Sequence, residues 1–280
     1  VFFNPFSRFI FQYHGQVITL DLSDPANPRE VGSLFAPELS DPRLGSGSPA
    51  YQTLPITAAL TYVASSTVTN DPATGVGRIV IANLSNPAAP AVSGTLLIPG
   101  TRLVYSLARL GNTVLILGDT LGSYDADSGL TGFLTLTALD ISNPAAPVIR
   151  QTLTTQLRDK DSATVLALAN NTFVVGGATL GTKPTLLLVD ASTPSALRFV
   201  PYETPVTVFP YRNAGSFFYT LSSVGLSTYR LDTLAGPALT ARVEIPKGTG
   251  VTVVPGSFSL APTSTIPGAD FDTYEWVQPV

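Results

Sequence analysis

The chain has 280 residues, a formal net charge of −4 and only 12% charged residues, whereas hydrophobic residues make up 44% of it. This length suits one large all-β domain or two ordinary domains. The net negative charge and the absence of charge blocks exclude nucleic acid as a partner and disfavour binding to anionic membranes. There is no cysteine, which excludes disulfides, thiolate catalysis and cysteine-ligated metals.

The first 35 residues predict four strands. Their alternating or aromatic-rich segments cover residues 2–6, 9–13, 16–22 and 29–35. Between the last two, Pro25 presets the backbone for a turn, and Ser23 and Asp24 can hydrogen-bond the amides of that turn. Residues 36–55 show no periodicity and contain many breakers, so we expect a long loop there.

The same plan of strands and turns continues along the chain. Polar insertions interrupt it at residues 69–75 and 119–132, and the charged run 158–161 reads as a solvated loop. The predicted strands cover residues 56–65, 78–84, 103–110, 113–118, 133–141, 163–169, 172–176, 185–190, 207–211, 216–222, 225–231 and 238–245. Three further segments near the end, 250–254, 257–260 and 271–277, predict the strands of a last unit.

A short motif recurs through this plan: an apolar strand, an Asp or Asn, a turn with a hydroxyl residue and proline, and another strand. It reads LDLSDPANPREVGS from Leu20, IANLSNPAAPAVSG from Ile81 and LDISNPAAPVI from Leu139, with a looser copy after Asp190. The equivalent positions Asp21, Asn83, Asp140, Asp190 and Asp232 are spaced by 62, 57, 50 and 42 residues. The last spacing is that of a four-stranded propeller blade, and loop insertions lengthen the others.

The sequence therefore predicts an all-β fold, a β-propeller of four-stranded antiparallel blades with no substantial helix. We expect five or six blades, with six favoured, in a single domain over residues 1–280 that can belong to a longer chain. The approximate blades are 1–35, 55–97, 102–155, 163–203, 205–246 and 249–280.

The three clear copies of the motif resemble the LVIVD repeat, a blade motif of bacterial and archaeal secreted and cell-surface β-propellers. The hydroxyl-Asx-Pro turn with a second proline three residues on is kept at 23–28, 85–90 and 142–147, and it loses the second proline at Leu197. The resemblance implies a propeller, an extracellular location and interaction roles. It implies no catalytic residues.

The repeated turn residues are interpreted as structural. A single active site needs its residues once, whereas these positions recur, so their side chains should accept hydrogen bonds from turn amides. These positions are Asp21, Pro25, Asn83, Pro87, Asp140, Pro144, Asp190 and Pro194.

One loop has the composition of a calcium site. Asp119, Asp125 and Asp127 supply carboxylates to it, and Gly129 allows the chain to fold around a hard cation. The loop lacks the distal glutamate of a complete EF-hand loop, so a solvated turn is the favoured alternative. No cofactor other than Ca²⁺ is suggested.

Three functions compete on this sequence. The favoured one is a non-catalytic extracellular or cell-surface module for interaction, adhesion or assembly, located outside the cell, in the periplasm or on the cell surface. The second is a self-assembling subunit of a surface layer or filament. The third is a propeller glycoside hydrolase or lyase using carboxylates such as Asp119, Asp125 or Glu203, which would stand roughly 5–10 Å apart in a cleft.

The expected partners are other proteins, surface glycans or further copies of the chain. No apolar run approaches the roughly 18 residues of a membrane-spanning helix, so we expect no membrane-spanning segment. His14 is the only histidine and lies beside Gly15 in a turn signal, so a histidine-dependent active site is not expected, and no catalytic residue is assigned.

Overall fold

The computed structural model describes residues 2–4, 8–13, 16–24, 26–35, 53–67, 76–120, 124–125, 129–130, 132–169, 171–214, 217–222, 225–231 and 236–244. Within these ranges the protein is all-β, and its strands form antiparallel four-stranded units. The same ranges contain no helix long and apolar enough to span a membrane.

The strands follow one another through five four-stranded units, called sheets below; the third and fourth share β14 and together form one continuous seven-stranded sheet. The first sheet contains β1 (Phe2–Asn4), β2 (Arg8–Tyr13), β3 (Gln16–Asp21) and β4 (Arg29–Phe35). The second contains β5 (Thr53–Pro55), β6 (Leu60–Thr67), β7 (Val76–Asn83) and β8 (Ala91–Ile98). The third contains β9 (Leu103–Leu110), β10 (Thr113–Asp119), β13 (Phe133–Asp140) and the first part of β14 (Val148–Ala167).

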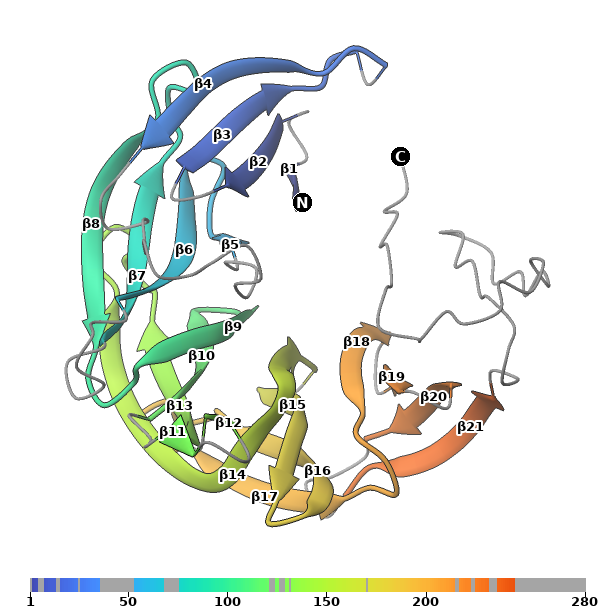
Figure 1. The fold of residues 1–280 in the computed structure, drawn as a ribbon. Helices are drawn as coiled ribbons and strands as arrows, with labels where there is room; N and C mark the ends of the chain where they lie inside the picture. Colours follow the sequence, from blue (N-terminus) through green and yellow to red (C-terminus); the bar gives the residue numbers. More distant parts are fainter. Residues whose placement is uncertain are drawn as a thin grey trace.

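The fourth sheet contains the second part of β14 with β15 (Thr172–Leu180), β16 (Lys183–Asp190) and β17 (Arg198–Glu203). The fifth contains β18 (Phe209–Ala214), β19 (Phe217–Ser222), β20 (Gly225–Arg230) and β21 (Ala238–Glu244). The sheets stand side by side around an arc, with β5, β9 and β18 toward its middle and β4, β8, β17 and β21 on its outside (Figure 1). The fold is propeller-like; the number of blades and the closure of the ring stay predictions, and the expected sixth unit at 249–280 lies outside the described residues.

Alternate side chains of the middle strands pack into the spaces on the two sides of each sheet. In β10, Val114 and Ile116 enter the core between the second and third sheets, whereas Leu115 and Leu117 enter the core between the third and fourth. β7 and β16 divide their side chains in the same way between neighbouring cores. Strands buried on both faces need continuous apolar runs, which explains sequences such as TVLIL and TLLLV.

The repeated turn also contacts the preceding sheet. The hydroxyl of Thr19 in the first sheet donates a hydrogen bond of 2.6 Å to the carbonyl oxygen of Pro87 in the turn of the second. The hydroxyl of Tyr62 in the second sheet donates one of 2.7 Å to the carbonyl oxygen of Pro144 in the turn of the third. The backbone N–H of Leu197, in the fourth turn, donates to Oε1 of Gln151 in the third sheet at 2.6 Å. Each turn is thus attached to the sheet before it.

Four local predictions are wrong. The loop predicted at 36–55 does not extend to residue 55, because Thr53–Pro55 form β5 and pair with β6. Residues 56–65 do not form one strand, because Ile56–Ala59 make a turn between β5 and β6 in which the Thr57 hydroxyl accepts hydrogen bonds from the N–H groups of Ala59 and Leu60. The predicted loop at 158–161 lies within β14, which continues from the third sheet into the fourth. The insertion 119–132 contains a two-stranded ribbon, β11 (Tyr124–Asp125) with β12 (Gly129–Leu130).

Gly32 in β4 tests the contact between the first two sheets. A Cβ atom there would lie 2.4 Å from the carbonyl oxygen of Pro87, so Gly32→Ala must push the second turn away. Gly94 follows the bulge of β8 as Gly32 follows that of β4, but a Cβ atom at Gly94 would lie 3.5 Å from Cδ1 of Ile81, an ordinary contact. We expect Gly32→Ala to lower the free energy of unfolding in urea by about 1–3 kcal/mol. Equal effects of Gly32→Ala and Gly94→Ala would contradict this.

Candidate functional site

The repeated Asx positions hold the turns through identical hydrogen bonds. Oδ1 of each accepts a hydrogen bond of 2.9 Å from the backbone N–H two residues on, in the pairs Asp21–Ser23, Asn83–Ser85, Asp140–Ser142 and Asp190–Ser192. Three turns add a second bond of this kind, from the N–H groups of Ala26, Ala88 and Ala145 to Asp24, Asn86 and Asn143. Pro87, Pro144 and Pro194 lie within these turns, and Pro25 lies outside the described residues. These side chains serve the turn geometry.

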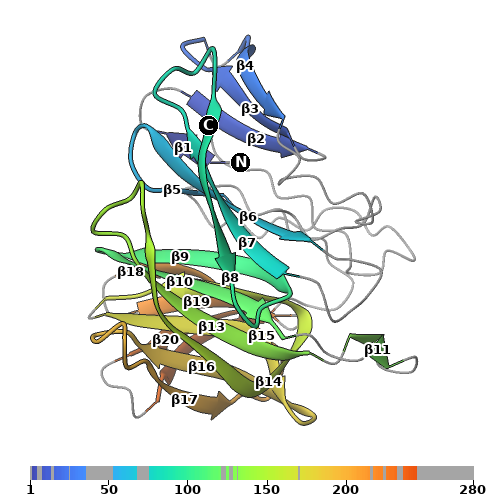
Figure 2. The same cartoon turned by 90° about the vertical axis from the view of Figure 1, so that its left-hand side faces the viewer.

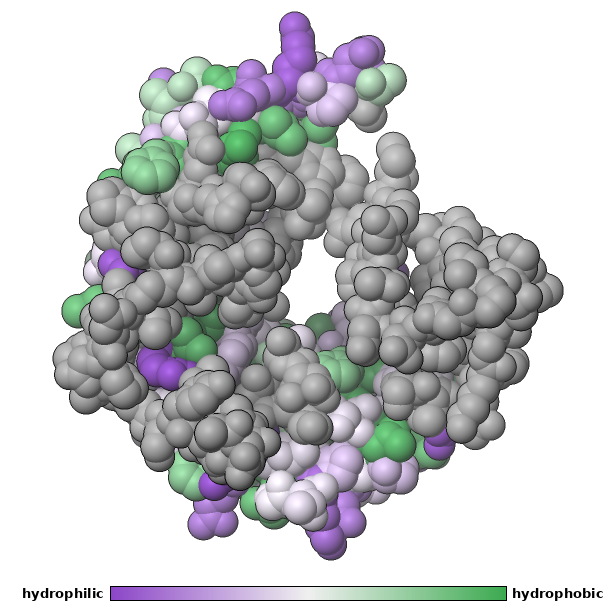
Figure 3. Space-filling model, viewed as in Figure 1, coloured by the Kyte–Doolittle hydropathy of each residue, from purple (hydrophilic) through white to green (hydrophobic). Residues whose placement is uncertain are grey.

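Arginines on the outer strands accompany the aspartates, a feature that the sequence analysis missed. Arg29 pairs with Asp21 at 3.6 Å, and Arg150 and Arg198 pair with Asp140 and Asp190 at 2.5 Å. In the second unit, where Asn83 replaces the aspartate, Ala91 faces it in place of an arginine. The aspartate and the arginine are thus both replaced in the second unit, and this joint replacement was the sequence signal that the two residues pair. Hydrophilic side chains accordingly lie on the outside of the first sheet, at the top of Figure 3.

Asp119 is buried at the end of β10 and is fully engaged. Its Oδ2 accepts hydrogen bonds of 3.0 Å from the Arg102 guanidinium and the Tyr105 hydroxyl, and its Oδ1 accepts one of 3.0 Å from the N–H of Leu103. Arg102 is buried as well, so the pair compensates two charges inside the protein. This arrangement ties the segment that enters β9 to the end of β10.

The other two carboxylates of the predicted calcium loop lie farther along the insertion. Asp125 ends β11, where its backbone pairs with Gly129, and Asp127 lies outside the described residues. In the ranges that the structure describes, no three His, Cys, Asp or Glu side chains gather into a metal-binding group. Since Asp119 already uses both carboxylate oxygens, calcium binding depends on Asp125 and Asp127 and stays a prediction.

Glu203, the third carboxylate considered for catalysis, is exposed at the end of β17. It forms an ion pair of 2.8 Å with Lys183, and both side chains face solvent. Asp119 is buried against Arg102, so these two carboxylates have different environments and different partners. Each of the two carboxylates is paired with a cation, so neither is a free general acid or base.

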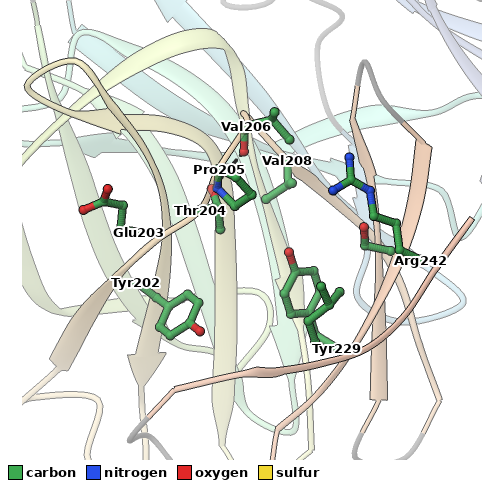
Figure 4. A pocket seen from close by; sticks show the side chains of 10 residues that line it. Tyr202, Glu203, Thr204, Pro205, Val206, Val208, Tyr229 and Arg242 are labelled. Atoms are coloured by element: carbon green, nitrogen blue, oxygen red, sulfur yellow. Dashed lines mark hydrogen bonds between the residues drawn. The ribbon is translucent and has the colours of Figure 1, made fainter. Parts of the chain in front are cut away.

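A pocket opens where the outer part of the fourth sheet meets the fifth (Figure 4). We call it the rim pocket; it is lined by Tyr202, Glu203, Thr204, Pro205, Val206, Val208, Ser227, Tyr229, Leu239 and Arg242. The segment 204–208 crosses from β17 to β18 along one side, and Tyr202 and Tyr229 lie on the other. Glu203 and Arg242 lie at opposite ends, so an apolar floor has one charge of each sign at its margins.

The walls of the rim pocket are fixed by contacts within the protein. Thr204 is buried. Its N–H donates a hydrogen bond of 2.9 Å to the carbonyl oxygen of Pro184, and its hydroxyl donates one of 2.8 Å to the carbonyl oxygen of Val206. The Tyr229 ring stacks on Phe218 with the ring centres 5.3 Å apart, and burial raises the pKa of the Tyr229 hydroxyl. These hydrogen bonds and the ring stacking fix the walls of the pocket.

Large apolar side chains are exposed beside the rim pocket. Tyr202 and Leu239, in its wall, are 36% and 53% exposed, and Val200, two residues before Tyr202 on the same face of β17, is 39% exposed. β17 is the outer strand of its sheet and exposes all six of its residues. Apolar groups thus continue from the pocket onto the outer surface.

Comparisons with known proteins identify the repeat and the fold. Residues 134–155 match the family model of the LVIVD repeat, which covers β13, the third turn and the start of β14. No curated protein matches the sequence. The resemblance to LVIVD-repeat propeller proteins is thus established for this segment.

Solved structures resemble the chain over most of its length. A functionally unknown protein from Desulfotomaculum acetoxidans aligns with a TM-score of 0.53 and 10% identity, over 88% of this chain and 68% of that one. A protein from Lactobacillus plantarum aligns with a TM-score of 0.51 and 11% identity, over 84% and 67% of the two chains. At these identities the likeness shows the fold alone.

The pKa values of the turn aspartates predict an acid-sensitive fold. Hydrogen bonds from the Ser142 hydroxyl and then Arg150 hold the pKa of Asp140 well below its ordinary value, and the Ser192 hydroxyl and N–H, with Arg198, lower that of Asp190. A carboxyl group whose pKa is lower in the folded state than in the unfolded state stabilises the fold at pH values above its unfolded pKa of about 3.9. This stabilisation is lost as the pH falls from there through the folded-state pKa.

We expect the urea concentration at the midpoint of unfolding to decrease as the pH is lowered from about 5 to about 2. In the Asp140→Asn/Asp190→Asn variant this decrease should be less steep. Asparagine is compatible with the turn, as Asn83 shows. A Glu30→Gln variant of the exposed outer strand serves as the control. Parallel pH profiles of the wild type and the double variant would refute the assignment.

Proposed function

We propose that this protein is a non-catalytic extracellular or cell-surface interaction module that binds another protein or a surface glycan at the rim pocket. The observation that carries the proposal is the pre-shaped pocket with exposed apolar side chains at Tyr202, Leu239 and Val200 beside it. Contiguous exposed apolar surface with a polar margin is typical of recognition sites.

The chemistry of the rim pocket suits binding. Tyrosine and arginine dominate the energetics of many interfaces, because each combines a large contact area with hydrogen-bonding groups. Tyr202 offers an exposed ring for an apolar side chain or a sugar ring, and Glu203 and Arg242 offer charges of both signs at the ends. A partner would place an apolar group on the floor and polar groups at both ends.

The composition supports a location outside the cell. The surface depends on Ser, Thr, Asn, Gly and Pro where intracellular proteins use more Lys and Glu, and only 12% of the residues are charged. The LVIVD match at 134–155 favours the same location by its resemblance to secreted and cell-surface propellers. Hydrolase activity is less well supported, because Asp119 and Glu203 are engaged by Arg102 and Lys183.

The rim pocket can be tested by comparing matched variants. Tyr202→Ser/Leu239→Ser removes the apolar margin, whereas Leu180→Ser removes a side chain of similar exposure from the end of β15, away from the pocket. We expect the wild type and Leu180→Ser to retain the same proteins or glycans from a cell-surface extract, and the double variant to retain about tenfold less. Quantitative mass spectrometry of the retained material measures this. Equal retention by all three proteins, with equal melting temperatures, would contradict the proposal, and hydrolysis of glycosides by the wild type would support the enzyme alternative.

A further inference from the structure

The outer end strands of the sheets differ in how they oppose pairing with another chain. The unpaired edge of a sheet is a template for a further strand, and proteins commonly block it with charges or proline. β4 carries Arg29 and Glu30, β17 carries Pro201, and β21 carries Arg242 and Glu244. β8 reads Ala-Val-Ser-Gly-Thr-Leu-Leu-Ile and contains neither a charge nor a proline. Its edge lacks both of these protections.

β8 is an extended strand at the outside of the second sheet. Among the described strands, only β7 pairs with it, and Figure 2 shows it running along the outer surface. A bulge at Ser93 shifts the register between Ile81 and Ala82, after which Gly94–Ile98 pair regularly with β7. A bulge discourages pairing at its own position only, so five regular residues remain.

The side chains of this segment match the demands of a paired strand. Thr95 and Leu97 point outward on one face, with Leu97 57% exposed, whereas Ile98 is buried in the core. Thr and Leu are compatible with the face of a strand. A leucine this exposed would be stabilised by packing against a side chain on a neighbouring strand. The partner strand must be neutral and free of proline over about the same length.

We propose that β8 pairs with β8 of a second copy of this chain, antiparallel about a two-fold axis. The second copy supplies a strand of the required composition, and a symmetric contact lets both copies use the same edge. Centred on Leu96, the pairing places Leu96 opposite Leu96, Thr95 opposite Leu97, and Gly94 opposite Ile98. The two second sheets then form one eight-stranded sheet, and no charged side chain is brought into the contact.

This contact is separate from the rim pocket. β8 belongs to the second sheet, whereas the rim pocket lies between the fourth and fifth. Self-association through β8 therefore goes beyond the proposed function and leaves the pocket open in both copies. A dimer with two open pockets would bind a multivalent surface with increased avidity.

The test measures the molar mass of the purified chain by light scattering during size exclusion, from low to high micromolar concentration. We expect the wild type to pass from monomer to dimer and Leu97→Lys to raise the dissociation constant about tenfold, because the lysine faces an uncharged edge. Adding Thr95→Glu to Leu97→Lys should restore the dimer, since the register places these opposite charges against each other twice. Val31→Lys, on the already charged β4, is the matched control and should leave the dimer intact.

Two results would overturn the proposal. One is a monomeric wild type at every concentration, and the other is a dimer that Leu97→Lys weakens no more than Val31→Lys does. Circular dichroism melting shows whether each variant is folded, and the retention assay on Tyr202→Ser/Leu239→Ser reports on the rim pocket independently. Failure of the dimer thus leaves the proposed function standing, and failure of the pocket leaves the dimer standing.

Discussion

The carbonyl oxygens at the tips of the second and third repeated turns link each of these sheets to the sheet before it. Pro87 and Pro144 have no N–H, and their carbonyl oxygens accept hydrogen bonds from Thr19 and Tyr62 across the boundary. The turn is shaped by Asx side chains that accept amides two residues on, so its tip reaches the neighbour in a fixed geometry. A four-stranded sheet with two apolar faces is stable only between neighbours. The turn therefore connects local sequence to the arrangement of the whole molecule.

The division of chemistry within each unit follows from this arrangement. The middle strands are buried on both faces and carry mostly apolar side chains. The ion pairs of Asp21, Asp140, Asp190 and Lys183 involve partners on outer strands, and the Arg102–Asp119 pair is buried. Three of the turn aspartates are paired with arginines of the outer strands and serve stability. The two proposed binding surfaces, the rim pocket and the edge of β8, lie on the outer surface and offer different kinds of contact. The repeated residues stabilise the fold, whereas the proposed binding surfaces are formed by residues outside the repeated motif.

The sequence predicted the strands and turns wherever its periodicity and breakers agreed. Outer strand β4 was predicted with its observed bounds, and the propeller-like stacking of four-stranded sheets followed from the repeats. The turn at Ile56–Ala59 was missed because it contains neither Gly nor Pro, and a threonine hydroxyl stabilises it. The run at 158–161 was misread because its charges suggested a loop, whereas β14 passes through it.

The candidate site was less predictable than the fold. Tyr202 is distant in sequence from Leu239 and Arg242, lies in another sheet and shares no motif with them, so only the packing of the sheets brings the three together. Asp119 was considered as a calcium ligand and as a catalytic carboxylate, but its partners Arg102 and Tyr105 depend on how β9 pairs with β10. The arginines opposite Asp21 and Asp190 were readable in principle, since Ala91 takes this place opposite Asn83, whereas Arg150 reaches Asp140 from two residues beyond the opposite position.

The most direct measurement of the central claim is the unfolding free energy of Tyr62→Phe. Tyr62 is fully buried, its pKa is raised to about 12 by burial, and its hydroxyl donates to the carbonyl oxygen of Pro144. Removing that one oxygen keeps the ring in the core but leaves the carbonyl without its donor. We expect a loss of about 1–3 kcal/mol relative to Tyr211→Phe, a variant at an exposed tyrosine. Equal unfolding free energies for the two variants would contradict the claim that the turns hold the sheets together.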